Sequence, residues 1–233
     1  MNLIHSDSKP IFGCVYKMGG DYTYVDVLRL KHNIERHTTM DFEFICLTDN
    51  PILLATSEND YGVEIYSDLN IHWALPLINN WKGWWSVIEL FRLTGPVMVT
   101  GLDTVFVGPV DPFFELAMNT SEEDFYMIHA FKRKEVWASG FMVWNGDWSW
   151  LYKDFNFKRD SRHYKWEQRY TKQRLLNKGV PIKGVQDEID GIYSFKHHCR
   201  KEGHPPTDAR AILFHGHPRP SHCRDTWIRK EWN

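Results

Sequence analysis

Blocks of apolar residues with different periodicities alternate along most of the 233-residue chain. Residues 11–16 (IFGCVY) and 42–48 (FEFICLT) are short runs that stop at glycines or at an Asp-Asn-Pro turn, so each predicts a strand. Between them, over residues 24–34, apolar side chains recur at steps of three and four, which is typical of one face of a helix. The chain therefore opens with a predicted β-α-β unit.

The alternation of strand and helix patterns continues to the end of the chain. Residues 84–93 and 165–178 have helical periodicity, and Gly179 closes the second of these helices. There is no repeat, low-complexity tract or long linker, so we expect a single domain over residues 1–233. The predicted fold class is α/β, Rossmann-like, with a mostly parallel central sheet flanked by helices. Further strands are predicted at residues 63–66, 97–100, 104–107, 125–130, 140–144 and 211–215.

Composition narrows the class of protein. The chain is 42% hydrophobic and 25% charged, which is average for a globular protein and unlike a disordered or fibrous one. No apolar run approaches the roughly 20 residues that span a bilayer, and the N-terminus lacks the pattern of an export signal. The four cysteines form no Cys-x-x-Cys pair, which argues against a zinc knuckle or a disulfide framework. We expect a cytoplasmic protein with no membrane span.

Aromatic content and charge distribution both depart from the average. Aromatic residues make up 15% of the chain, including 11 Trp, and such residues stack on sugar rings or bases. Residues 1–130 carry 7 Lys and Arg against 18 Asp and Glu, whereas residues 131–233 carry 21 against 12. This asymmetry favours an anionic partner for the second half, or else two solvated faces, and both interpretations stay open.

Ligands of α/β sheets bind at the carboxyl ends of strands. Three strand ends carry candidate chemistry: residues 100–103 (TGLD) and 215–220 (HGHPRP), which follow predicted strands, and residues 139–140 (SG), which open one. The block GWWSVIELFRLTGPVMVTGLDTVFVGPVD resembles the central block of the glycogenin-like (family 8) glycosyltransferases of the GT-A fold, where a helix leads into a strand that ends in Asp-x-Asp. ILFHGHPRP resembles their late His-Gly-x-x-Lys-Pro segment, and YVDVLRLKHNIERH followed by FEFICLTD resembles their opening β-α-β unit.

The resemblance covers roughly residues 11–220 and implies a metal-dependent transferase. It would move a sugar, UDP-hexose being the first candidate donor, from a nucleoside diphosphate to a hydroxyl with retention at the anomeric carbon. Asp103 and His215 match the family's metal-binding Asp and His. One carboxylate, one imidazole, diphosphate oxygens and water suit Mn²⁺ or Mg²⁺ better than Zn²⁺, so manganese is the expected cofactor, with magnesium as the alternative.

The resemblance also implies donor-binding residues. Arg219 stands where the family has a diphosphate-binding lysine, and Gly216 lets the backbone approach closely. Asp187 resembles the acidic residue beside the reacting sugar, and an ordinary acidic helix start is the alternative. Tyr16 and Gly20 fall where the base and ribose contacts lie, and the alternative for them is a core residue and a turn.

Two residues depart from the family pattern. Gly101 replaces the first acid of Asp-x-Asp, and Val87 replaces a lysine that follows the paired tryptophans. A degenerate transferase that binds a sugar or nucleotide without turnover is therefore the alternative function. Trp84 and Trp85 fit core packing better than the floor of a sugar pocket. A dinucleotide oxidoreductase is disfavoured because no Gly-x-Gly-x-x-Gly follows the first predicted strand.

Residues 153–183 carry ten Lys and Arg against three Asp and Glu, interleaved with aromatic residues. Proteins hold a phosphate backbone and stack on bases with this mixture, so residues 131–233 are the expected acceptor-facing half. The implied acceptor is anionic, either nucleic acid with a hydroxymethylated base or a phosphorylated glycan. A solvated helix whose aromatics pack inward is the alternative. The acceptor-side candidates are Arg162, Lys165, Trp166 and Arg169.

Overall fold

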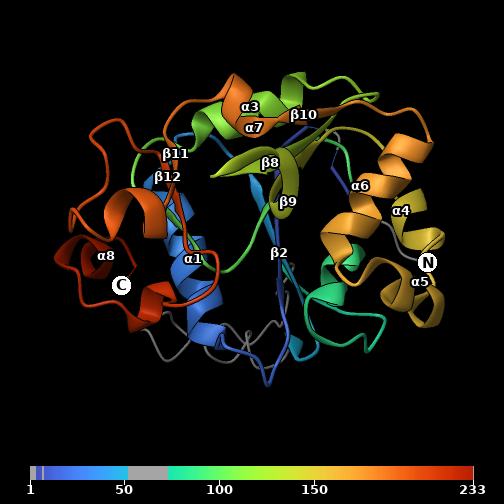
Figure 1. Ribbon diagram of the computed structural model, residues 1–233, viewed down its shortest axis with the longest axis horizontal. Coiled ribbons are helices and arrows are strands. Elements are labelled where there is room, and N and C mark those ends of the chain that lie inside the picture. The colour runs from blue at the N-terminus through green and yellow to red at the C-terminus, as the bar shows by residue number, and fades with distance from the viewer. Residues whose placement is uncertain (1–3, 7, 52–72, 233) are drawn as a thin grey trace.

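A seven-stranded sheet runs through the middle of the computed structural model, which describes residues 4–6, 8–51 and 73–232 (Figure 1). Its strands are β2 (Ile11–Tyr16), β3 (Glu43–Thr48), β4 (Ala74–Pro76), β6 (Val97–Thr100), β8 (Phe125–Ala130), β9 (Arg133–Trp144) and β10 (Ile182–Gly184). Their order is β10-β8-β9-β6-β2-β3-β4, and only β9 is antiparallel to its neighbours. The predicted α/β class with a mostly parallel sheet is confirmed.

Two smaller sheets flank the central one. β1 (Ile4–His5) pairs with β5 (Leu93–Thr94), and β11 (Ile192–Ser194), β12 (Ala211–Leu213) and β7 (Thr104–Phe106) form a three-stranded sheet. The strands predicted at 104–107 and 211–215 thus exist, but in this small sheet rather than the central one. Since β12 runs antiparallel to β7, the chain that leaves β12 passes the end of β6, and the Phe214 amide donates to the Asp103 carbonyl at 2.9 Å.

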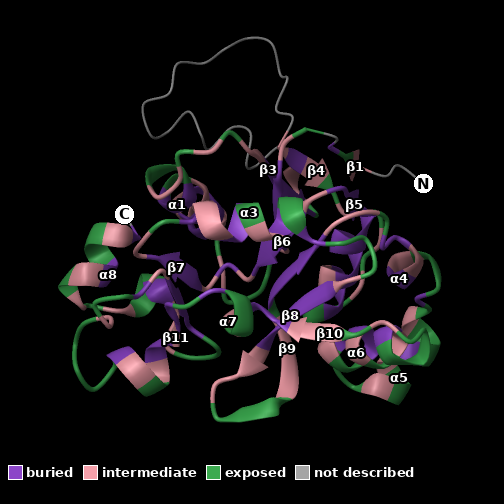
Figure 2. Cartoon of the chain, turned by 90° about the horizontal axis from the view of Figure 1, so that it is seen from above, coloured by how far each residue is buried: buried purple, intermediate pink, exposed green. Residues whose placement is uncertain are grey.

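Helices cover both faces of the central sheet, and its inner strands, such as β3 and β6, are purple for buried in Figure 2, whereas the first half of β9 is pink and green. One face packs against α1 (Tyr24–Arg36), α3 (Asp111–Asn119) and α8 (Thr226–Glu231), and the other against η2 (Gly83–Arg92), α4 (Trp150–Lys153) and α6 (Glu167–Asn177). The remaining helical segments are α5 (Phe157–Tyr164), α7 (Val185–Glu188), η3 (Phe195–Cys199) and η4 (Pro220–His222). No helix within the described ranges has the length and apolar character needed to cross a membrane.

Two predicted helices differ from the observed ones for identifiable reasons. The segment predicted at 84–93 is the 3₁₀ helix η2, in which Trp85, Ile88 and Phe91 are buried at the three-residue spacing of that helix type. The helix predicted at 165–178 begins at Glu167, because Lys165 has a φ of 64° and separates α5 from α6. The strand predicted at 63–66 lies outside the described residues.

Candidate functional site

The carboxyl ends of β2 and β6 meet at one edge of the sheet, because these two strands are parallel neighbours. Arg219, from the segment after β12, joins the two loops that follow them. Its Nη1 donates to Asp103 Oδ2 at 2.7 Å and its Nη2 to Asp21 Oδ2 at 2.9 Å. The guanidinium also lies over the ring of Tyr22, 4.7 Å from its centroid. We call Asp21, Tyr22, Asp103 and Arg219 the arginine cluster.

The arginine cluster is partly removed from solvent, with the side chains of Arg219 and Asp103 only 15% and 19% exposed. Burial raises the pKa of Asp103, against the opposing effects of the Arg219 charge and a hydrogen bond from Tyr22. The hydrogen bond from Arg219 lowers the pKa of Asp21. Burial disfavours the charged form of Arg219, but the hydrogen bond to Asp21 and the neighbouring negative charges outweigh it and raise its pKa. Arg219 is therefore a permanent cation.

The absence of a side chain at Gly101 leaves space for the Asp103 carboxylate. An ideal Cβ at position 101 would lie 2.7 Å from Asp103 Oδ1, so a side chain there would push that carboxylate aside. The Gly101 amide itself donates to the Gly140 carbonyl at 3.1 Å. The replacement of the first acid of Asp-x-Asp by glycine is thus linked to the position that Asp103 adopts.

His215 also has partners of its own. Its Nε2 lies 2.6 Å from Ser194 Oγ, and its ring stacks on Phe131 with centroids 5.7 Å apart. Burial lowers the pKa of His215, and the charges of Lys196 and His197 lower it further. At neutral pH the ring is therefore uncharged.

Lys196 is a cation that sequence reasoning missed. It lies on η3, and its Nζ is 3.0 Å from the point where a Cβ on Gly216 would stand. Gly216 has a φ of 83°, a conformation that favours glycine. No Asp or Glu within the described ranges forms an ion pair with Lys196, whose side chain is half-buried. Sequence reasoning gave no signal for it, because the strand that precedes it, β11, was not predicted.

Asp103 and His215 do not form a metal site in this arrangement. Asp103 Oδ2 is bound to Arg219 and His215 Nε2 to Ser194, so each side chain already has one of its two ligating atoms engaged. Across the described ranges, no three His, Cys, Asp or Glu side chains are grouped closely enough to hold one. Because a guanidinium already neutralises Asp103, these residues as placed do not fit Mn²⁺ or Mg²⁺, and we derive no step through either ion.

Asp187 lies on α7, and its carboxylate accepts a hydrogen bond from His129 Nε2 at 2.7 Å. The other ring nitrogen of His129 is 2.5 Å from the Lys134 carbonyl, and the ring stacks on Trp137 with centroids 4.2 Å apart. Only glycine fits at position 184, because a Cβ there would lie 2.3 Å from His129 Nε2. Sequence reasoning missed His129, although its place near the carboxyl end of a predicted strand was a usable signal.

Residues at and just after the end of β8 contact both Asp187 and His215. His129 holds Asp187, and two residues further along the chain Phe131 stacks on His215. Tyr16 is buried in the core at the end of β2, and Gly20 lies in the exposed turn that follows. Their predicted base and ribose contacts stay predictions.

Two exposed tryptophans form a pair on the same side of the sheet. Trp84 is 52% and Trp166 45% exposed, and their ring centroids are 5.3 Å apart. The favoured core role is therefore wrong for Trp84, whereas Trp85 is buried and stacks on Phe155, as core packing predicted. We call Trp84 and Trp166 the tryptophan pair.

Glu167, the residue after Trp166, forms a hydrogen bond that places the start of α6 near the end of β6. Its carboxylate accepts a hydrogen bond from Ser139 Oγ at 2.5 Å, and burial raises its pKa. Ser139 adjoins Gly140, whose carbonyl binds the Gly101 amide, so the start of α6 stands next to the loop that carries Asp103. Sequence reasoning missed Glu167, which reads as an ordinary acid in the first turn of a helix.

The basic segment 153–183 is only partly available to a ligand. Arg159, Arg174 and Lys183 are paired with Asp160, Asp154 and Asp124, and Phe155 and Tyr170 are buried. The inward-packing interpretation thus holds for these two aromatics, whereas Trp166 faces solvent. The predicted acceptor cations are all exposed, and they are Arg162, Lys165 and Arg169.

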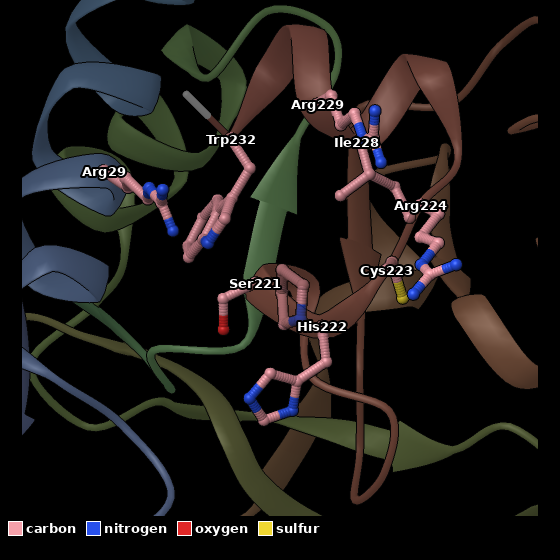
Figure 3. A pocket seen from close by; sticks show the side chains of 9 residues that line it. Arg29, Ser221, His222, Cys223, Arg224, Ile228, Arg229 and Trp232 are labelled. Atoms are coloured by element: carbon pink, nitrogen blue, oxygen red, sulfur yellow. The ribbon is translucent and has the colours of Figure 1, made fainter.

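A hollow of about 470 Å³ opens beside the arginine cluster, where Arg29 reaches in from α1 and Ser221 and His222 follow Arg219 along the chain (Figure 3). Its other lining residues come mainly from α8 and the turn before it. None of the predicted donor-binding residues lines it, so we do not assign the donor to it.

The fold is that of the GT-A glycosyltransferases, as the sequence resemblance predicted. The structure is similar to that of apo glycosyltransferase GlyE from Streptococcus pneumoniae TIGR4, with a TM-score of 0.61 and 12% identity over 97% of this chain and 60% of that one. It is also similar to galactosyltransferase LgtC in complex with donor and acceptor sugar analogs (TM-score 0.57, 10% identity, 95% of this chain and 93% of that one). A third similar structure is apo mouse xyloside xylosyltransferase 1 (TM-score 0.53, 6% identity, 89% of this chain and 98% of that one).

These similarities establish the fold alone. The chain spans 60% of the length of the GlyE chain that it matches. No protein-family model matches the sequence. No curated protein matches it either.

Proposed function

We propose that this chain is a glycosyltransferase that moves a hexose from a nucleoside diphosphate to a hydroxyl group. The observation that carries the proposal is the convergence of Asp103, Arg219 and the Gly216 turn at the carboxyl edge of a GT-A sheet. A fixed guanidinium and an open glycine backbone are suited to a diphosphate, which is the leaving group of such a donor. UDP-hexose is the first donor to test.

The reaction breaks the bond between the anomeric carbon and the diphosphate oxygen, and the bonding electrons leave with the diphosphate. A new bond forms between the anomeric carbon and the acceptor oxygen, whose proton passes to the departing diphosphate. Arg219 stabilises the negative charge that develops on the leaving group. Retention at the anomeric carbon is expected from the family resemblance, and no residue is assigned as a covalent nucleophile.

Asp187 is proposed to bind the hydroxyls of the transferred sugar or to stabilise positive charge at its anomeric carbon. His129 acts as a positioning residue, because its 2.7 Å hydrogen bond and its stacking on Trp137 fix the Asp187 carboxylate. His129→Gln should therefore lower the turnover rate more than it weakens donor binding. Equal losses in kcat and in donor affinity would contradict this positioning role.

The acceptor is proposed to lie against the tryptophan pair and to carry negative charge. Two exposed indole rings present apolar faces for a sugar ring or a base, and Arg162, Lys165 and Arg169 are exposed cations close to Trp166 in the sequence. DNA with a hydroxymethylated base and a phosphorylated glycan are the two acceptors to compare. Binding of nucleic acid should fall linearly on a log-log salt plot, and reversal of the three cations to Glu should abolish it.

A panel of nucleotide sugars, with released nucleoside diphosphate as the signal, tests the transferase. Release from one donor, stimulated by an acceptor and lost in Asp103→Ala by ~100-fold, supports the proposal. Tight binding of a donor with no release in any condition would favour the alternative of a degenerate, non-catalytic binding protein, for which Gly101 and Val87 are the motivating residues.

A further inference from the structure

The sequence resemblance and the structure disagree about the cation beside Asp103. The resemblance implies a divalent ion held by Asp103 and His215, but the structure has the Arg219 guanidinium on Asp103 Oδ2 at 2.7 Å. The second predicted ligand, His215, has its Nε2 on Ser194. An ion at Asp103 would have to displace a cation that is already bound by two carboxylates.

Gly101 leaves room for the second carboxylate oxygen of Asp103. Oδ1 lies 2.7 Å from the point where a Cβ of residue 101 would stand, so a second acid at that position would displace it. The loss of that acid and the exchange of lysine for arginine at position 219 are complementary changes. Arg219 binds Asp103 through Nη1 and Asp21 through Nη2, so a protein cation occupies the place beside Asp103 that the resemblance gives to an ion.

One nitrogen of Arg219 has no hydrogen-bond partner. Its two terminal nitrogens bind Asp21 and Asp103, whereas Nε is buried and unpartnered within the described ranges. Lys196 adds a second cation on the other side of the same turn, beside Gly216, and forms no ion pair with a described acid. Phe195 stacks on Phe214 at 4.2 Å and so holds the start of η3 against the residue before His215.

We infer that this chain binds the diphosphate of its donor without a divalent metal, with Arg219 and Lys196 supplying the positive charge. The inference rests on the proposed function, since it names how that donor site neutralises its ligand. Lys196 Nζ lies 3.0 Å from the ideal Cβ position of Gly216, and Arg219 follows Gly216 by three residues. Because Gly216 has no side chain, phosphate oxygens can approach the backbone of this turn and the two cations near it.

Calorimetric titration tests the inference with UDP, CDP, GDP, ADP and dTDP, each in buffer with EDTA and in buffer with Mn²⁺. The diphosphate that binds is expected to have the same affinity in both buffers. Arg219→Ala and Lys196→Ala should each weaken it by roughly tenfold to a hundredfold, because each removes a charged hydrogen bond. Lys201→Ala is the matched control, since it removes the same charge from an exposed site five residues from Lys196 and should leave affinity unchanged.

The corresponding free nucleoside checks that the variants are folded, since neither substitution should alter its affinity. Mn²⁺ binding followed by electron paramagnetic resonance should show no tight site in the presence or absence of the diphosphate. Binding that appears only with Mn²⁺, or unchanged affinity in Arg219→Ala and Lys196→Ala, would overturn the inference and leave the transferase proposal standing. Failure of every nucleoside diphosphate to bind in either buffer would instead overturn the proposed function.

Discussion

Two arginine–carboxylate pairs in this molecule have the same chemistry and different surroundings. Arg92 and Glu89 on η2 are 4% and 0% exposed, and the Glu89 carboxylate also accepts the amides of Ile78 and Asn79 at 2.8 and 2.6 Å. Arg219 and Asp103 lie at the sheet edge and are 15% and 19% exposed. The Nε atoms of Arg92 and Arg219 are both buried without a hydrogen-bond partner, so this feature does not distinguish the pairs. The first pair holds a loop to the core, whereas the second joins the loops that carry the candidate residues. Burial and place in the fold thus separate a structural pair from a candidate site.

The sharpest test of this contrast is the stability of two variants. Glu89→Ala leaves Arg92 buried without its counter-charge and should lower the free energy of unfolding by about 3 to 5 kcal/mol. Arg219→Ala leaves Asp103 without its partner at a site that is 19% exposed, and should cost less, about 1 to 3 kcal/mol. Urea denaturation of both variants measures the difference. Equal losses would show that the arginine cluster is as structural as the pair on η2.

Adjacent tryptophans extend the same contrast to apolar side chains. Trp85→Ala should lower the free energy of unfolding by about 3 to 5 kcal/mol, because it empties a site packed against Phe155. Trp84→Ala should cost about 1 kcal/mol or less, since the ring is half exposed and loses chiefly its contact with Trp166. Thermal or urea unfolding checks both. A large loss for Trp84→Ala would return that residue to the core and remove the tryptophan pair from the proposed acceptor site.

Gly184→Ala tests whether the close packing of His129 and Asp187 matters for stability and transfer. A Cβ at position 184 would lie 2.2 Å from Asp187 Oδ2 and 2.3 Å from His129 Nε2, so one of these side chains must move. We expect a loss of about 1 to 3 kcal/mol in stability and a fall in sugar transfer larger than any fall in diphosphate affinity. Gly179→Ala is a useful comparison, because nothing lies within 4 Å of its added Cβ and its effect would come from its positive φ alone. Transfer unaffected by Gly184→Ala would remove Asp187 from the reaction.

The smallest expected effect is a pH dependence that originates at His215. Burial lowers its folded pKa, whereas an unfolded histidine titrates near 6.5. Stability from this group is complete above about pH 6.5 and is lost as the pH falls toward the folded pKa, because protons then bind the unfolded chain preferentially. His215→Asn should flatten the decline in urea midpoint between about pH 7.5 and 5. An unchanged slope would assign the dependence to another group, and His197 is the first to examine, since burial also lowers its pKa.

Local patterns predicted the elements that the candidate site stands on. Short apolar runs that end at turn residues indicated β2, β3, β6 and β8, because strands covered on both faces are apolar at nearly every position and their ends need turn chemistry. The segment 84–93 was expected as an ordinary helix and is a 3₁₀ helix, because apolar residues at steps of three satisfy either type until packing selects one. The order of motifs indicated the GT-A fold, which the similar solved structures confirm.

The residues of the site were foreseeable singly but not in their pairings. Asp103 and Arg219 were both candidates, and the sequence assigned one to a metal and the other to a phosphate. They are 116 residues apart in the chain, and Arg219 is 198 residues from Asp21, so no local pattern records that they touch. Three further residues were missed for the same reason: His129, Lys196 and Glu167. Each is a candidate only because of a neighbouring residue on another element.

The sequence by itself therefore determined the fold class, the strand ends and the kinds of side chain that stand there, since these follow from periodicity and turn residues within short windows. Only the tertiary structure decided which cation neutralises Asp103, which tryptophan of the 84–85 pair faces solvent, and which positive charges of the basic segment are already paired. Charge neutralisation and burial depend on distance in space. That distance is set when the small sheet of β7, β11 and β12 carries the last part of the chain past the end of β6.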